Sequence, residues 1–242
     1  MQACKLTLSL ICCIACCSCA KQWRESYFNY SGVKVQKTDV QNLKGLAYVV
    51  AEKDGIRWAS NVTILAKRPG GIRIDIFDKL ADIVSTISYR DNKGYIHTIV
   101  GNKWEGIDNG HFVIPGFGEM PVSSGAMADI LMGHPYIDKG FKETAEHSKG
   151  GTYQIKGDVD DLEMDSKMGV PIGYTRYTSS DKKAIIFEAF FDDFVNIKNI
   201  KVPRHLVIRF ERPRLLMDIR YKDIQTNVNI PWELIEVKPR SK

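Results

Sequence analysis

The sequence predicts an all-β protein with a few short helices, built on an antiparallel sheet of about ten or more strands. Three observations carry this prediction. Strand-like segments recur after residue 42, turn signals such as Asp91-Asn92-Lys93-Gly94 return about every ten residues, and only one segment has a clear helical pattern. A sheet of this size curls as a barrel or a sandwich. No linker and no internal repeat is evident, so we expect one domain over residues 33–242.

Strands are predicted where β-branched and aromatic residues alternate or run between turn signals. Ile72, Ile74 and Ile76 show the period of a half-buried strand. Expected strands in the first half cover residues 43–51, 57–66, 72–77, 83–90, 95–100 and 104–107. Those in the second half cover residues 152–159, 162–167, 172–178, 183–191, 202–211, 215–222 and 224–229, with a final piece at 231–237.

One helix is expected, after a stretch at residues 109–122 that reads as irregular because glycines and prolines interrupt it. Ser123 or Ser124 is placed to cap a helix running from about Gly125 to Met132. Met127, Ile130 and Leu131 are spaced three and four apart, so they share one face of that helix. This face is predicted to be apolar.

The leader reads as an export signal. Residues 6–19 form an apolar and small-residue run that is too short to span a bilayer as a helix but fits the core of a signal peptide. All six cysteines lie in the first nineteen residues, and the run ends at Ser18-Cys19. This ending resembles the lipobox of bacterial lipoproteins, which implies a signal peptide at 1–18, lipidation of Cys19 and a lipid-anchored tether at 19–32. Cys16 is the alternative lipidation site, and a plain secretory signal is the other interpretation.

Composition excludes several classes of function. With 44% hydrophobic and 26% charged residues, the chain is neither disordered nor a polytopic membrane protein. The net charge of +5 is too small and dispersed to indicate nucleic acid binding. From Ala20 onward there is no cysteine, which removes disulfides, thiolate metal sites and a cysteine nucleophile from the body. No cofactor is indicated.

Patterns that would indicate catalysis or metal binding are weak. The five histidines are not at helical i, i+4 spacing, so no metal site is expected. The acidic run from Asp158 to Asp165 lacks the glycine and the terminal glutamate of an EF-hand, and a solvated hairpin is the simpler interpretation. No spacing nominates a catalytic carboxylate pair, so we expect no enzyme. A hydrolase with dispersed acids is the least supported alternative.

A family resemblance adds to this interpretation. Four short motifs resemble the LolA/LolB lipoprotein-carrier superfamily, and more specifically LolB-like outer-membrane lipoproteins. They are the opening strand Leu43-Lys44-Gly45-Leu46-Ala47, the strand ending in Lys67-Arg68-Pro69, the turn Asp78-Lys79-Leu80-Ala81 and the closing Ile130-Leu131-Met132-Gly133-His134-Pro135. The resemblance implies an unclosed antiparallel β-barrel with a helical lid. It implies an apolar cavity for acyl chains of lipoproteins, and a protruding turn whose leucine assists cargo insertion into the outer membrane.

Site residues follow from the resemblance together with strand alternation and the helix face. Ile74, Ile76, Ile87, Met127, Ile130 and Leu131 are the candidate cavity-lining residues. Leu80 matches the leucine of the cargo-transfer turn, although a hairpin leucine packed on the body is the simpler alternative. The implied partners are the outer membrane, acylated lipoproteins or other lipids, and a periplasmic carrier protein, on the periplasmic face. The alternative function is a structural or assembly lipoprotein with a filled β-core that docks an envelope partner.

Overall fold

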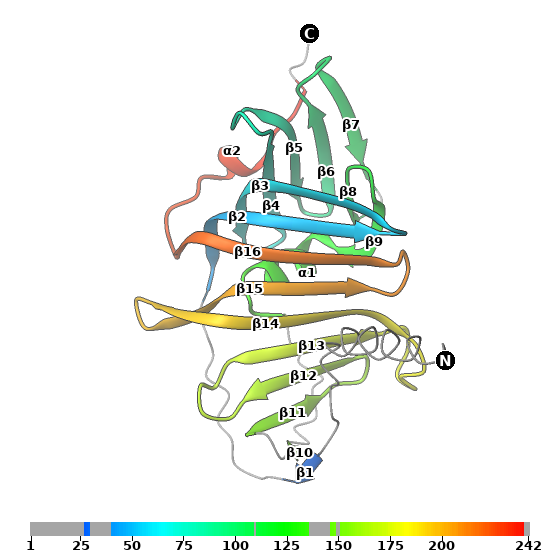
Figure 1. The fold of residues 1–242 in the computed structure, drawn as a ribbon, viewed down its shortest axis with the longest axis vertical. Coiled ribbons are helices and arrows are strands. Elements are labelled where there is room, and N and C mark those ends of the chain that lie inside the picture. Colours follow the sequence, from blue (N-terminus) through cyan, green and yellow to red (C-terminus); the bar gives the residue numbers. More distant parts are fainter. Residues whose placement is uncertain (1–26, 30–39, 109, 136–145, 149–150, 240–242) are drawn as a thin grey trace, which may run out of the picture.

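The fold is a curled antiparallel sheet with one helix against its inner face (Figure 1). The computed structural model describes residues 27–29, 40–108, 110–135, 146–148 and 151–239. Fourteen strands form one sheet in the order β1-β10-β11-β12-β13-β14-β15-β16-β2-β3-β4-β5-β6-β7, and β8 and β9 pair separately. The two ends of this order do not pair with each other, so the sheet is unclosed.

The strands of the sheet are long in its middle and short at its edges. The first half contributes β1 (Tyr27–Asn29), β2 (Asn42–Lys53), β3 (Ile56–Lys67), β4 (Gly71–Phe77), β5 (Ile83–Arg90), β6 (Lys93–Thr98) and β7 (Lys103–Ile107). The second half contributes β10 (Glu146–Ser148), β11 (Thr152–Lys156), β12 (Asp160–Asp165), β13 (Pro171–Tyr177), β14 (Ile185–Ile197), β15 (Ile200–Phe210) and β16 (Leu215–Thr226). The all-β prediction is therefore confirmed, and the strand count exceeds the expected minimum.

Helix α1 (Ser124–Leu131) begins where the sequence indicates. The Ser123 side chain accepts a hydrogen bond from the backbone N–H of Ala126 at 3.2 Å, which satisfies one of the free donors of the first turn. The helix ends at Leu131, and Gly133, which follows the C-cap residue Met132, has a φ of +71° in the left-handed region. Met127, Ile130 and Leu131 are all buried, so the predicted apolar face does turn inward.

Three sequence expectations are wrong at the level of elements. The expected final strand at residues 231–237 is not formed, because this segment contains the short helix α2 (Trp232–Ile235). Residues 109–122 are not wholly irregular, because they contain the hairpin of β8 (His111–Ile114) and β9 (Gly118–Ser123), joined by a turn with Gly116 at φ +81°. Residues 215–222 and 224–229 are not two strands. They are mostly one strand, β16, whose register with β2 shifts between Tyr221 and Asp223, so a bulge continues the pairing where a turn was expected.

The acidic run at residues 158–165 belongs to a hairpin, as expected. Asp160 accepts hydrogen bonds from the Tyr174 hydroxyl at 2.7 Å and from Arg176 at 3.0 Å on the neighbouring strand. Asp165 accepts hydrogen bonds from the backbone N–H groups of the turn that follows β12. These carboxylates are therefore engaged in holding the sheet together.

The C-terminal strap, residues 227–239, lies across the outer face of β3, β4 and β5 and contains the short helix α2 (Trp232–Ile235). Trp232 lies directly over Gly71, where a side chain would collide with its ring. Lys67 and Arg90 lie over the same ring at 4.6 and 4.9 Å from its centroid. Arg73 donates to the carbonyl of Leu234 at 3.0 Å. The strap thus packs on the outer face of β3, β4 and β5, opposite the inner face that α1 covers.

Candidate functional site: an apolar pocket under helix α1

The candidate site is a pocket between the inner face of the sheet and α1. Strand alternation places one set of apolar side chains on this inner face, and α1 covers them with its own apolar side. The lining is entirely apolar and comes from seven elements. It consists of Val49, Trp58, Val62, Ile64, Ile74, Ile76, Ile87, Phe112, Ile114, Met127, Leu131, Met217 and Ile219.

Five of the six candidate cavity residues lie around this pocket. Ile74, Ile76 and Ile87 line it from β4 and β5, and Met127 and Leu131 line it from α1. Ile130 is buried in the same core but lies outside the pocket lining. The helical spacing placed it on the inward side of α1, but that side is wide enough for some of its residues to pack elsewhere.

The remaining lining residues are not predicted by the sequence pattern. Phe112 and Ile114 lie in the β8–β9 hairpin, which the glycines and prolines of that stretch hid. Met217 and Ile219 lie on β16, far along the chain from the other lining residues. Their alternation is visible in the sequence, but nothing local shows that β16 pairs with β2 and joins the same wall.

The pocket is small in this state. Its volume is about 40 Å³, which is room for little more than a few methyl groups. Ligand-binding pockets usually enclose about 300–1,000 Å³. An acyl chain could therefore enter only if one of the covering elements moved, and the covering elements are α1 and the β8–β9 hairpin.

Four contacts hold α1 over the pocket, and three of them are polar. Arg68, in the turn after β3, approaches Asp129 with its Nε 2.6 Å from Oδ1 and donates from Nη2 to the carbonyl of His134 at 3.0 Å. The buried Tyr221 hydroxyl donates to the carbonyl of Leu131 at 3.0 Å. Gly133 packs directly against Pro203 of β15. All of these contacts lie in the second half of α1 or just after it.

Burial dominates the electrostatics of this attachment. It raises the pKa of the Asp129 carboxyl, and the hydrogen bond and charge of Arg68 offset only part of that effect. Burial also lowers the pKa of His134 to about 4, with the nearby Arg68 acting in the same direction. Among the contacts that hold the helix is thus one partly buried ion pair, in which the charge of Arg68 compensates the buried Asp129 carboxylate.

The β8–β9 hairpin is the second cover. Its Val113 N–H donates to the Tyr89 hydroxyl at 2.7 Å, and Phe112 packs on the Tyr89 ring at 5.3 Å between centroids. Lys53, at the end of β2, donates to the carbonyl of Phe117 at 3.0 Å. The hairpin is therefore held through β8 and through its turn, and it carries fewer anchoring charges than α1.

Leu80 lies at the tip of the β4–β5 turn and is 83% exposed, so it is not packed on the body. The Asp78 side chain accepts hydrogen bonds from the backbone N–H groups of Leu80 and Asp82 at 2.8 and 3.0 Å. An aspartate that satisfies its own turn in this way gives the turn a defined shape. Ile76, which lines the pocket, lies four residues before Leu80, near the end of β4 that leads into this turn.

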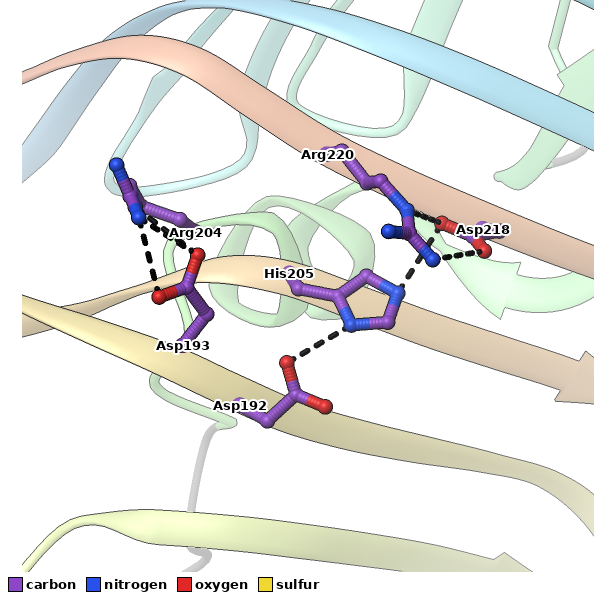
Figure 2. Close-up of polar contacts among 6 residues, drawn as sticks. All are labelled: Asp192, Asp193, Arg204, His205, Asp218 and Arg220. Atoms are coloured by element: carbon purple, nitrogen blue, oxygen red, sulfur yellow. Dashed lines mark hydrogen bonds and ion pairs between the residues drawn. The ribbon is translucent and has the colours of Figure 1, made fainter.

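A polar cluster on the outer face of β14, β15 and β16 is the other conspicuous constellation (Figure 2). His205 has Nδ1 2.8 Å from Asp192 and Nε2 3.1 Å from Asp218, and Arg220 also donates to Asp218. Both ring nitrogens face carboxylates, so His205 on β15 links Asp192 on β14 to Asp218 on β16. Burial raises the pKa of Asp218, but Arg220 and His205 together outweigh burial and hold it below its usual value.

This outer cluster joins neighbouring strands, because each of its carboxylates contacts a histidine or an arginine on the strand beside it or on its own strand. Arg204 and Asp193 form a second pair beside it, with two hydrogen bonds of 3.1 Å (Figure 2). Within the part of the chain that the structure describes, no three His, Cys, Asp or Glu side chains are arranged to hold a metal ion. The chemistry of the cluster is that of a cross-strand clamp.

The lipidation prediction lies outside the described residues. Cys19, the alternative Cys16 and the signal peptide at 1–18 all precede Tyr27, and most of the expected tether at 19–32 does too. In the described ranges, no helix combines the length and the apolar character that crossing a bilayer requires.

Comparison of the fold with solved structures gives consistent neighbours. A putative outer membrane lipoprotein-sorting protein domain from Vibrio parahaemolyticus has a TM-score of 0.56 at 6% identity, covering 79% of this chain and 88% of its own. A LolA superfamily protein from Nitrosomonas europaea has a TM-score of 0.54 at 9% identity, covering 82% and 91%. The fold is LolA-like.

A third neighbour widens the range of sequences that share this fold. A DUF1329 family protein from Desulfovibrio piger has a TM-score of 0.54 at 11% identity, covering 82% of this chain and 90% of its own. No protein-family model and no curated protein matches the chain by sequence. At such low identities the likeness concerns the fold, and the role of the pocket has to be argued from its residues.

Proposed function

We propose that this protein is a lipid-anchored envelope protein that binds an acyl chain of a lipoprotein, or of another lipid, beneath α1 and assists its delivery to the outer membrane. The observation that carries the proposal is the wholly apolar pocket between α1 and the sheet. An acyl chain presents only apolar surface, so burial there needs no polar partner. No covalent step is involved.

The closed pocket supports a binding cycle with two states of α1. In the closed state the helix covers the apolar wall and Arg68 compensates the buried Asp129 carboxylate. In the open state the helix swings away and an acyl chain replaces Met127 and Leu131 against the sheet. The strap on the outer face keeps β3, β4 and β5 in place while the inner cover moves.

Leu80, LolB-like specificity, the Cys19 anchor and a periplasmic carrier as donor belong to the same proposal. The exposed Leu80 turn supports a role in passing cargo to a membrane, because an aliphatic side chain held out by an ordered turn can enter the apolar part of a bilayer. Transfer would then run from a weaker carrier site to this pocket and on to the bilayer.

The alternative function is favoured by one observation, the small volume of the pocket. A pocket of only about 40 Å³ leaves little free space between α1 and the sheet. Such a well-filled core also suits a structural or assembly lipoprotein that docks an envelope partner through its surface. The two functions differ in whether α1 ever opens.

The test labels acyl chains in cells that express the full chain. The cells receive a fatty acid that carries a photoreactive diazirine and an alkyne, and after irradiation the adducts on the purified protein are mapped by mass spectrometry. The proposal expects adducts on peptides that contain Ile74, Met127 or Leu131. Ile74→Trp, which fills the pocket, should remove them.

Ile186→Trp is the matched control, because Ile186 is also a half-buried isoleucine packed on the core but lies outside the pocket lining. It should leave the adducts unchanged. Adducts that are absent from the pocket peptides, or that both variants reduce equally, would reject acyl binding and favour the filled-core alternative.

A further inference from the structure

A second exposed aliphatic turn lies beside the Leu80 turn. Val100 is 75% exposed, and its neighbour Ile99 is also exposed. They lie in the turn between β6 and β7. Leu80 lies in the turn between β4 and β5, and the exposed Ile83 is the first residue of β5. These four residues are among the exposed large hydrophobic residues of the described chain, and all of them lie in or beside these two turns.

The two turns are neighbours in space. β5 and β6 pair antiparallel, so the start of β5 and the end of β6 lie at the same end of the sheet (Figure 1). The pairing extends into the turns, because the N–H of Ile99 donates to the carbonyl of Val84 at 3.0 Å. Leu80, Ile83, Ile99 and Val100 therefore form one aliphatic tip.

The second turn is braced as firmly as the first. The Asn102 side-chain oxygen lies 2.8 Å from His97 Nε2 and accepts from Trp104 Nε1 at 3.2 Å. The two rings stack face to face with centroids 3.9 Å apart. The N–H of Asn102 also donates to the carbonyl of Ile99 at 3.0 Å. A turn held in this way cannot fold Ile99 and Val100 back onto the body without losing these bonds.

We infer that this aliphatic tip is a bilayer-contacting surface to which the β6–β7 turn contributes alongside Leu80. Its exposed side chains are branched aliphatics rather than the tyrosine, tryptophan and arginine that anchor protein interfaces. Lys79 and Lys103, both exposed, stand next to them, so their charges meet anionic headgroups while the aliphatics reach the acyl region. The β4–β5 turn also carries two carboxylates: Asp78 is turned into its own turn by two hydrogen bonds, and Asp82 is exposed. The preference for a bilayer therefore rests on the aliphatic side chains, and the two lysines balance the two carboxylates.

The inference deepens the proposed function, because it names the surface that meets the receiving membrane. Ile76 lines the pocket and lies at the end of β4 that leads into the tip. A tip made of two turns fixes the orientation of the sheet against a bilayer, whereas a single leucine would leave it free to rotate about one point.

The test places a photoreactive amino acid at position 80, 100 or 56 of the full chain in cells. Ile56 is the matched control, since it is an aliphatic residue that follows a turn and is 70% exposed, but it lies at the β2–β3 turn. After irradiation, mass spectrometry separates adducts with phospholipid from adducts with protein. We expect lipid adducts at positions 80 and 100, and none above background at position 56.

Each other outcome overturns the inference. Lipid adducts at position 80 alone would remove the β6–β7 turn from the surface. Protein adducts at position 100 would make the tip a docking site for a protein partner. Equal lipid adducts at all three positions, or none at any, would mean that the tip has no special contact with the bilayer. Acyl adducts inside the pocket are a separate readout, so failure of the proposed function is distinguishable from failure of the tip.

Discussion

Replacing Arg68 by methionine should loosen α1 specifically. Methionine keeps an apolar stem but removes the guanidinium, which leaves the Asp129 carboxylate buried without its partner. Breaking a fully buried ion pair costs about 3–5 kcal/mol. The Arg68 side chain keeps 27% of its exposure, so we expect the free energy of unfolding to fall by about 2–3 kcal/mol.

The loss should depend on pH with a definite sign. The pKa of Asp129 is already raised by burial, and removal of Arg68 raises it further. A carboxyl group with a raised pKa in the folded state favours folding below its unfolded pKa, and this stability is lost as the pH rises through the folded value. The substitution Arg68→Met should therefore lower the free energy of unfolding less at pH 5 than at pH 8, as measured by urea unfolding.

Hydrogen exchange locates the effect. If about 2 kcal/mol of the loss falls on local opening, the amides of α1 should exchange on the order of 30-fold faster. Arg73→Met is the matched control, because Arg73 is 23% exposed and pairs at 3.0 Å with the buried Asp75 on the outer side of the sheet. It should lower stability without speeding exchange in α1. Equal exchange in both variants, or unchanged exchange after Arg68→Met, would refute the role of the ion pair in holding the helix.

Three further predictions concern the same end of α1 and the tip. The pKa of His134, lowered to about 4 in the folded state, means that the unfolded chain takes up a proton first as the pH falls. Stability should therefore drop by on the order of 3 kcal/mol between about pH 6.5 and 4, and urea unfolding of His134→Gln should lack this component. Gly133→Ala should cost at least about 1 kcal/mol in thermal unfolding, because φ is +71° and a Cβ would meet Pro203 Cδ at 2.3 Å; an unchanged melting temperature would contradict this. Leu80→Glu should retain acyl adducts in the pocket but block release of cargo into liposomes, and normal release would remove Leu80 from the transfer step.

The helix and the inner wall formed by β4 and β5 could be predicted from the sequence, because both depend on local periodicity. Ser123 and the three apolar residues of α1 sit within one short segment, so capping and spacing sufficed. Ile74, Ile76 and Ile87 were found because alternation shows in each strand alone. Alternation does not say which face is concave, and here the resemblance to a curled sheet supplied the missing choice.

The rest of the site depends on contacts between distant parts of the chain. Arg68 meets Asp129 across a separation of 61 residues, and no local pattern marks either residue as a partner of the other. Phe112 was hidden because glycine and proline in its hairpin imitate an irregular loop. The bulge after Tyr221 appeared as the end of a strand, since it interrupts alternation without interrupting the pairing.

The place of β16 in the sheet affects the order in which strands can pair as the chain is synthesised. β16 lies between β15 and β2, so the first long strand and the last one meet in the middle of the sheet. The strands from β2 to β7 can each pair with their sequence neighbours as they are synthesised. The pocket wall is complete only after β16 has been synthesised, because Met217 and Ile219 belong to it. Pairings between such distant segments form slowly. We therefore expect the inner wall of the sheet to be complete only when nearly all of the chain has been synthesised.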